Sequence, residues 1–309
     1  MPKTLKFTQA TLNLCLFICL LSKSISGFAQ QVKNVPDAFA HISVTPKVFV
    51  LSNDIDVPTK NGHFQGVQVI NSSGREKLLI SGSSSSLAFV LQADLSTQKT
   101  EKLIALMDEP FRHAGGIQVS GDYLAVGIED NIIKTRSKVR LYNYHNDNLA
   151  KALPNLNIDR EGEAEQQTSG AVALLPLNSH YLMVVSNWDS RIWDFYAVNP
   201  EKQEQEILHS FTAPDNWAGY QSINLLRDEN AIYAIGFYSK EHISYADLIL
   251  ISDRETYDPI MKKIASKAFN TTNGVDFGSA AGVQVDKEGN LHIWGTQNKA
   301  SKGIAVNKF

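Results

Sequence analysis

Short apolar strand patterns recur along the chain at intervals of about fifty residues, which is the signature of one repeated supersecondary unit. Each begins with small residues and then places apolar side chains at alternate positions, as expected of a β-strand. Four of the five carry an amide on the face opposite the central apolar residue. The five segments are 65–69, 115–119, 169–173, 221–225 and 281–285.

A second apolar run follows each of these segments after a short turn. The runs are near-continuous and rich in β-forming residues, as expected where both faces of a sheet are covered. Turn residues such as those of 120–122 and 286–290 separate the two strands of a unit. The second runs lie at 78–82, 124–127, 182–186, 232–236 and 291–295.

The repeated strands predict an all-β fold, a five-bladed β-propeller. The fifth unit stops on its third strand at Phe309, while residues 40–51 contain an apolar strand with no unit of its own. We therefore expect the N-terminal strand to complete the last blade and close the ring, which removes its free edges. The alternative is a six-bladed ring with a degenerate blade in residues 128–165.

The pattern resembles five-bladed β-propeller proteins as an architectural group, over almost the whole chain after residue 40. No family signature accompanies it, since Trp193-Asp194, the pair typical of WD40 repeats, occurs in one unit only. The group includes lectins and glycoside hydrolases, so the resemblance implies either binding or catalysis and does not choose between them.

The N-terminus predicts export. Residues 1–29 combine Lys3 and Lys6 with an apolar run too short to span a bilayer, as in a cleaved signal peptide. Residues 30–309 are then a single secreted or periplasmic propeller domain without cysteine. Loss of three lysines with the leader lowers the formal charge from −3 to −6. This acidity argues against a nucleic-acid partner.

Antiparallel geometry brings the start of each first strand and the end of each second strand to the same rim, here called the entrance rim. Candidate acid–base residues gather there. His63 and His113 stand before the first two units, where they are candidates for proton transfer or for two imidazole ligands joined by a carboxylate such as Glu129 or Asp189. The alternative is that the histidines only hydrogen-bond loops between blades. The candidate catalytic residues are His63, His113, Glu129, Asp189 and Asp276.

Candidate ligand-binding residues share this rim. Trp188, between Asn187 and Asp189, is the most suggestive, because an aromatic ring beside polar groups suits a sugar ring or a protein hot spot. Rim packing is the alternative. The full set is Gln65, Ser169, Asn187, Trp188, Tyr220, Gln221 and Tyr238. A basic run at 134–138 predicts a local positive patch. The opposite rim carries mostly turn residues of little chemical variety.

The recurring amides Gln68, Gln118, Asn224 and Gln284 are expected to hydrogen-bond neighbouring blades, or alternatively to line a polar channel. The histidine spacing predicts no metal site, and no cofactor is indicated. The sequence favours a propeller that binds a small molecule, glycan or protein ligand at the channel mouth. The alternative is a hydrolase, lyase or isomerase that uses a histidine with a carboxylate partner in the same pocket.

Overall fold

The computed structural model describes residues 30–58, 60–72, 74–143, 156–253 and 259–309, and the predicted leader lies outside them. Strands dominate these residues, and α2 (Val35–His41) is their one α-helix. None of the described segments forms a helix long and apolar enough to span a membrane.

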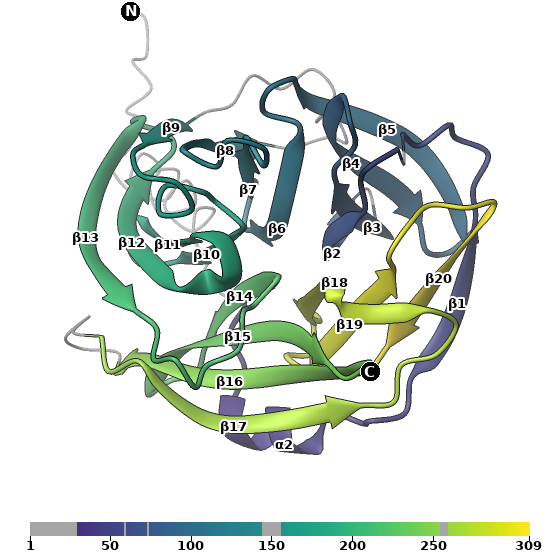
Figure 1. Ribbon diagram of the computed structural model, residues 1–309. Coiled ribbons are helices and arrows are strands. Elements are labelled where there is room, and N and C mark those ends of the chain that lie inside the picture. The colour runs from purple at the N-terminus through teal and green to yellow at the C-terminus, as the bar shows by residue number, and fades with distance from the viewer. Residues whose placement is uncertain (1–29, 59, 73, 144–155, 254–258) are drawn as a thin grey trace, which may run out of the picture.

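Antiparallel pairing follows chain order within five sets of four strands, arranged around a common centre (Figure 1). The first three sets are β2 (Phe64–Ser72), β3 (Arg75–Gly82), β4 (Leu87–Asp94) and β5 (Lys99–Asp108); β6 (His113–Ser120), β7 (Tyr123–Glu129), β8 (Arg136–Asn143) and β9 (Leu156–Glu161); and β10 (Ala171–Pro176), β11 (Tyr181–Ser186), β12 (Ile192–Asn199) and β13 (Glu204–Thr212). A short 3-10 turn, η4 (Trp188–Ser190), precedes β12.

The last two sets use the end of the chain and one strand from its beginning. They are β14 (Ser222–Arg227), β15 (Ala231–Lys240), β16 (Ile243–Asp253) and β17 (Lys262–Phe269); and β18 (Val275–Val285), β19 (Leu291–Gln297), β20 (Gly303–Lys308) and β1 (Lys47–Ser52). The expected pairing of the N-terminal strand with the last strand is present, since β1 runs antiparallel to β20 from Lys47↔Lys308 to Ser52↔Gly303.

Single parallel bridges connect some of these sets. Gly66 pairs with Ala281 and Gly116 with Ala171, so hydrogen bonding merges the strands into three continuous sheets. The described strands of 128–165 are the end of β7 with β8 and β9, which continue one sheet. The architecture is therefore all-β with propeller-like sheets.

Each apolar core cluster lies between two neighbouring sets. One combines Val67 and Phe89 with Trp294 and Val306, which joins the first set to the last. Burial differs from centre to periphery: β7 and β10 are buried throughout, whereas β13 is mostly exposed. This pattern follows from sheets stacked on both faces, with only the outer strands in contact with water.

The small residues that open each unit are required where first strands approach each other at the centre. A Cβ added to Gly282 would lie 1.8 Å from the carbonyl oxygen of Val67, and one added to Gly116 would lie 2.7 Å from the Ser222 side chain. Any larger side chain would force these strands apart. The small residues of the repeat therefore allow the first strands to lie close together at the centre of the ring.

Three of the four recurring amides join first strands. The Gln118 side chain donates to the Leu225 carbonyl oxygen (2.8 Å) and accepts from the backbone N–H groups of Leu174 (3.0 Å) and Leu225 (2.8 Å). Asn224 likewise bridges Ile117 and Val283, and Gln68 accepts from the backbone of Val119. Gln284 differs, because it bonds to Glu76 and Trp294 on neighbouring strands instead.

Gln30 adds a contact of the same kind from the start of the described chain. Its amide donates to the carbonyl oxygens of Leu174 (3.1 Å) and Leu225 (3.3 Å) and accepts from the Ser120 hydroxyl (2.6 Å). These partners belong to β10, β14 and β6, so one side chain connects three sets.

The helix α2 was not predicted, although its local signals are clear. The Asn34 side chain accepts from the Asp37 backbone N–H (2.8 Å), and Pro36 occupies the first turn. Val35 and Phe39 pack into the core cluster that contains Phe237 and Phe277. The helix thus covers apolar side chains of the fourth and fifth sets.

Candidate functional site

A cavity of about 100 Å³ at the entrance rim collects eight of the predicted site residues together with Gly170. Antiparallel strand ends place several of them: His113 is the first residue of β6 and Glu129 the last of β7, and the two are register partners. Trp188 and Asp189 come from η4. The eight residues are His63, Gln65, His113, Glu129, Trp188, Asp189, Tyr220 and Gln221.

His113 and Glu129 form a buried pair in this cavity. Glu129 is fully buried, and its Oε1 lies 3.2 Å from His113 Nδ1. The other carboxylate oxygen accepts from the backbone N–H of Ser169 (2.9 Å). Neither His113 Nδ1 nor Glu129 Oε1 has a hydrogen-bond partner among the described residues, so their 3.2 Å contact is an ion-pair distance without hydrogen-bond geometry. The carboxylate therefore lies beside Nδ1 of the imidazole and favours a proton on that nitrogen.

Gln65 lies between the two imidazoles. Its Nε2 is 2.9 Å from His113 Nε2 and 3.0 Å from His63 Nδ1, and the two rings stand 5.9 Å apart at 74°. An amide N–H that donates to His113 Nε2 requires a lone pair there, which agrees with a proton on Nδ1 facing Glu129. His113 thus presents a basic nitrogen toward the cavity.

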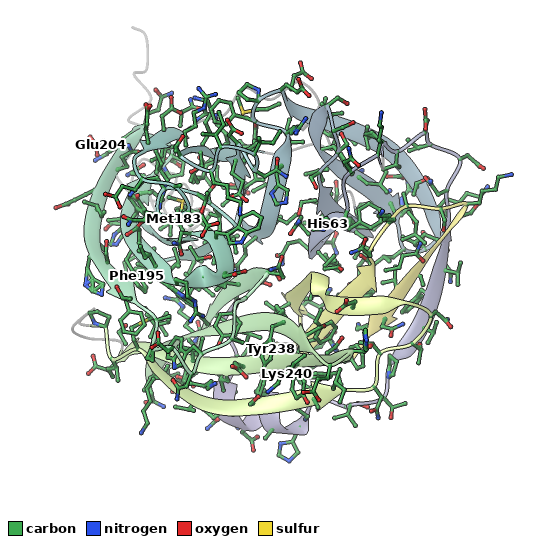
Figure 2. All side chains as sticks on the ribbon, viewed as in Figure 1. His63, Met183, Phe195, Glu204, Tyr238 and Lys240 are labelled. Carbon is green, nitrogen blue, oxygen red and sulfur yellow. The ribbon has the colours of Figure 1, made fainter. Side chains whose placement is uncertain are left out.

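His63 is held in its neutral form. Burial lowers its pKa below the ordinary value of 6.5, a hydrogen bond to the Phe64 carbonyl acts in the opposite direction, and the neighbouring His113 lowers the pKa further. His63 Nδ1 lies 3.0 Å from that carbonyl oxygen. Figure 2 shows His63 toward the centre of the ring of sheets, whereas Glu204 of β13 lies at its periphery.

The turn that carries Trp188 is fixed by hydrogen bonds. The Thr168 hydroxyl accepts from the Trp188 backbone N–H (2.6 Å), and the Ser190 hydroxyl donates to the Tyr220 carbonyl (2.8 Å). Asp189 and Ser190 have φ values of 53° and 50°, which is uncommon for residues other than glycine. Such backbone strain is often found at functional positions.

Trp188 faces the pair on one side and a cation on the other. Its ring lies 6.2 Å from the His113 ring, and Lys134 Nζ sits 3.8 Å from its centroid. Lys134 also pairs with Glu165 (2.9 Å). The contact between Lys134 and Trp188 was not predicted, because it joins loops of two different sets and no local pattern in the sequence encodes it.

Tyr220 forms the remaining wall of the cavity, and its hydroxyl group is held by a hydrogen bond. Its hydroxyl donates to Asp247 Oδ2 (2.8 Å), which also lies 3.3 Å from Lys263 Nζ. Burial raises the pKa of Tyr220 well above its usual range, and the Asp247 carboxylate raises it further. The phenol therefore stays protonated and is a poor candidate for proton transfer.

Four of the predicted residues do not line the cavity. Ser169 is buried behind it and bonds Glu129 through its backbone, and the Asn187 side chain is occupied by Glu165 and Ile192. Tyr238 stacks on Tyr245 at 5.2 Å. Asp276 accepts from Ser239 and from the backbone of Gly278. These side chains are therefore engaged by neighbours outside the cavity.

The expected positive patch is neutralised by acidic neighbours. Arg136 pairs with Asp130 (3.2 Å) and Lys138 with Asp159 (3.0 Å), in addition to the Lys134 pair. The positive charges of this surface run are therefore paired with acids on β9 and the adjacent loops. Within the described segments, no group of three or more His, Cys, Asp or Glu side chains is arranged to hold a metal ion.

No protein-family model and no curated protein matches this sequence. Several solved structures share its fold. The catalytic domain of a Coprinopsis cinerea GH62 alpha-L-arabinofuranosidase superposes with a TM-score of 0.54 at 8% identity, over 86% of this chain and 98% of that one.

Two further structures are similar. A GH43 endo-arabinanase from Bacillus licheniformis has a TM-score of 0.52 at 10% identity, over 81% of this chain and 95% of that one. A GH62 hydrolase solved in complex with xylotriose has a TM-score of 0.51 at 10% identity, over 88% of this chain and 100% of that one. At these identities the likeness concerns the fold, and it agrees with the predicted propeller architecture.

Proposed function

We propose that this protein is an exported, single-domain, five-bladed β-propeller enzyme that acts on a carbohydrate, with His113 and Glu129 as its acid–base pair. The five sets of four strands support the blade count, with the single parallel bridges as contacts between innermost strands. The carbohydrate substrate is supported by a fold shared with proteins described as arabinanase, arabinofuranosidase and xylotriose-binding hydrolase.

The observation that carries the proposal is the buried Glu129 carboxylate 3.2 Å from His113 Nδ1, with Nε2 directed toward Gln65 and the cavity. A carboxylate that orients an imidazole makes the opposite nitrogen an effective acceptor and then donor of a proton. Neutral His63, 5.9 Å away between ring centroids, is placed to assist the second transfer.

This arrangement favours proton transfer at a sugar carbon or hydroxyl over hydrolysis by two carboxylates. Glycosidases that use two carboxylates place them about 5 to 10 Å apart on either side of the scissile bond. Here Glu129 is buried behind His113, while Asp189 is exposed on η4. Elimination or isomerisation through His113 therefore fits the cavity better than a standard glycosidase mechanism.

The cavity size limits how the ligand sits. A volume of about 100 Å³ is well below the roughly 300 to 1,000 Å³ of typical small-molecule sites. The enclosed space accommodates one part of a sugar, and we expect the remainder to lie over the rim beside Trp188. The Lys134 ammonium over the indole would move or contact the ligand directly.

The test measures the activity of the whole protein on arabinan, arabinoxylan and polygalacturonate. Release of reducing ends reports bond cleavage of either kind, and ultraviolet absorbance of an unsaturated sugar distinguishes elimination. Where turnover is found, we expect His113→Gln to reduce kcat by at least about 10²-fold. The matched control is His41→Gln, whose side chain is 78% exposed on α2.

Retained turnover in His113→Gln would contradict the proposed role. A second candidate, the non-catalytic binding of a glycan at the same mouth, is favoured by Gln65, which occupies the space between the imidazoles. Measurable glycan affinity without turnover, weakened by Trp188→Ala and unchanged by His113→Gln, would support that function instead.

A further inference from the structure

A second, larger hollow lies on the rim opposite the entrance cavity, where the sequence predicted only chemically simple turns. Its volume is about 580 Å³. It is formed where the first and last sets meet, from the start of β1, the ends of β20, and the turns β2–β3 and β4–β5. Its lining includes Phe49, Trp294, Lys47, Lys308, Arg75 and Ser96.

Two aromatic rings form the floor of this opposite-rim hollow. Phe49 and Trp294 stack with centroids 5.8 Å apart at 25°. Phe49 is half-buried and Trp294 is buried, and the indole N–H donates to Gln284 Oε1 (2.9 Å). The floor is therefore rigid and already assembled before any ligand arrives.

Two ammonium groups cover this floor without a carboxylate partner. Lys47 Nζ lies 5.1 Å from the Phe49 centroid, and Lys308 Nζ lies 5.1 Å from the Trp294 centroid. Across the part of the chain that the structure describes, neither lysine pairs with an acid, unlike Lys134, Lys138 and Lys77. Their charges are available to an incoming anion.

Arg75 extends the positive edge of the hollow. One guanidinium nitrogen lies 3.3 Å from Asp94 Oδ2, but Asp94 is bonded more closely by Lys77 (2.7 Å), and the Arg75 side chain is 59% exposed. Glu76, on the same turn, is occupied by the Gln284 amide. The part of the Arg75 guanidinium that does not contact Asp94 faces water and is suited to bind a carboxylate.

We propose that this hollow is a second binding site, separate from the entrance cavity, for an oligosaccharide that carries carboxylate groups. The half-buried Phe49 ring and the methylene stems of lysine contact the apolar faces of sugar rings, while Lys47, Lys308 and Arg75 pair with the uronate carboxylates. The Thr45 hydroxyl also lines the hollow. The hydroxyl groups of Ser43 and Ser96 donate to the Thr45 carbonyl and to Asp94, and their oxygens remain acceptors for sugar hydroxyls. The proposal does not depend on the reaction assigned to the entrance cavity.

The experiment is calorimetric titration of the whole protein with 1,4-linked digalacturonate, and with neutral 1,4-linked galactobiose as the matched ligand. We expect digalacturonate to bind at least tenfold more tightly than galactobiose, and its affinity to fall as salt is raised. The double variant Lys47→Met/Lys308→Met should weaken digalacturonate binding at least tenfold. The control is Lys287→Met, a lysine 86% exposed on the same rim.

Three results would overturn the proposal: no binding of digalacturonate, equal affinity for galactobiose, or unchanged affinity in the double variant. Stronger binding of hexaglutamate than of digalacturonate would identify an acidic-peptide site instead. If the double variant does not fold, Arg75→Met provides the same test with a surface side chain. Turnover at the entrance cavity should be unchanged in Lys47→Met/Lys308→Met, whose side chains lie outside that cavity, so failure of either proposal is seen separately.

Discussion

Two groups of buried polar side chains in this protein differ in how completely their hydrogen bonds are satisfied. At the centre, Gln118 makes three bonds to the backbone of neighbouring first strands. At the entrance rim, Gln65 contacts only imidazole nitrogens, and Glu129 Oε1 and His113 Nδ1 have only each other among the described residues. Complete bonding indicates a structural role, whereas incomplete bonding marks groups available for chemistry.

The largest expected effect comes from removing a structural amide. Gln118→Ala leaves the backbone N–H groups of Leu174 and Leu225 without partners in the dry centre, while the Leu225 carbonyl keeps its bond from Gln30. We expect the free energy of unfolding to fall by about 3 kcal/mol or more. The matched change, Gln65→Ala, should cost less than about 1 kcal/mol, because it removes no backbone partner. Urea denaturation of both variants measures the difference, and equal losses would contradict the comparison.

An intermediate effect is expected at the buried pair. Glu129→Ala and His113→Ala each leave a polar group without its partner, so both should lower stability. Their double variant should lose less than the sum, with a coupling energy of about 1 to 3 kcal/mol. A double-mutant cycle in urea provides the value. Additive losses would mean that the 3.2 Å contact does not connect the two side chains energetically.

The smallest expected effect depends on pH. Because the pKa of His63 in the folded protein lies below its ordinary 6.5, the unfolded chain binds this proton more readily. Stability from this group is complete above pH 6.5 and declines as the pH falls from there toward the folded pKa. His63→Gln should remove that part of the decline. Superimposable pH profiles of unfolding for the two proteins would show that His63 is not perturbed.

Much of the fold could be predicted because the small residues of the repeat reflect a steric requirement at the centre of the molecule. The segments 65–69, 115–119 and 281–285 lie within β2, β6 and β18, and the glycines that mark them are forced by the approach of backbones at the centre. The pairing of β1 with β20 could be predicted by counting strands. The last unit lacked one strand and the N-terminal strand belonged to no unit, so the simplest arrangement pairs the two. The helix α2 was missed although its cap and proline were visible in the sequence.

The site was predictable in position but not in contacts. Antiparallel geometry brings His113 and Glu129 to one strand end, and both were candidates. Which acid meets which imidazole depends on side-chain directions that a repeat does not encode: Glu129 pairs with His113, Asp189 lines the cavity, and Asp276 bonds Ser239 outside it. The hollow over Phe49 and Trp294 was not predicted at all, since these residues are 245 positions apart (294 − 49) and meet only through ring closure.

The pairing of β1 with β20 has a consequence for biosynthesis. The strand β1 is synthesised early, but its edge stays uncovered until residues 303–308 have been made. Gln30 likewise lacks one of its hydrogen-bond partners until Leu225 has been made. Such distant contacts slow folding and leave strand edges exposed in the growing polypeptide. The last set of strands is therefore the stage at which a partly synthesised chain is most open to association with its neighbours.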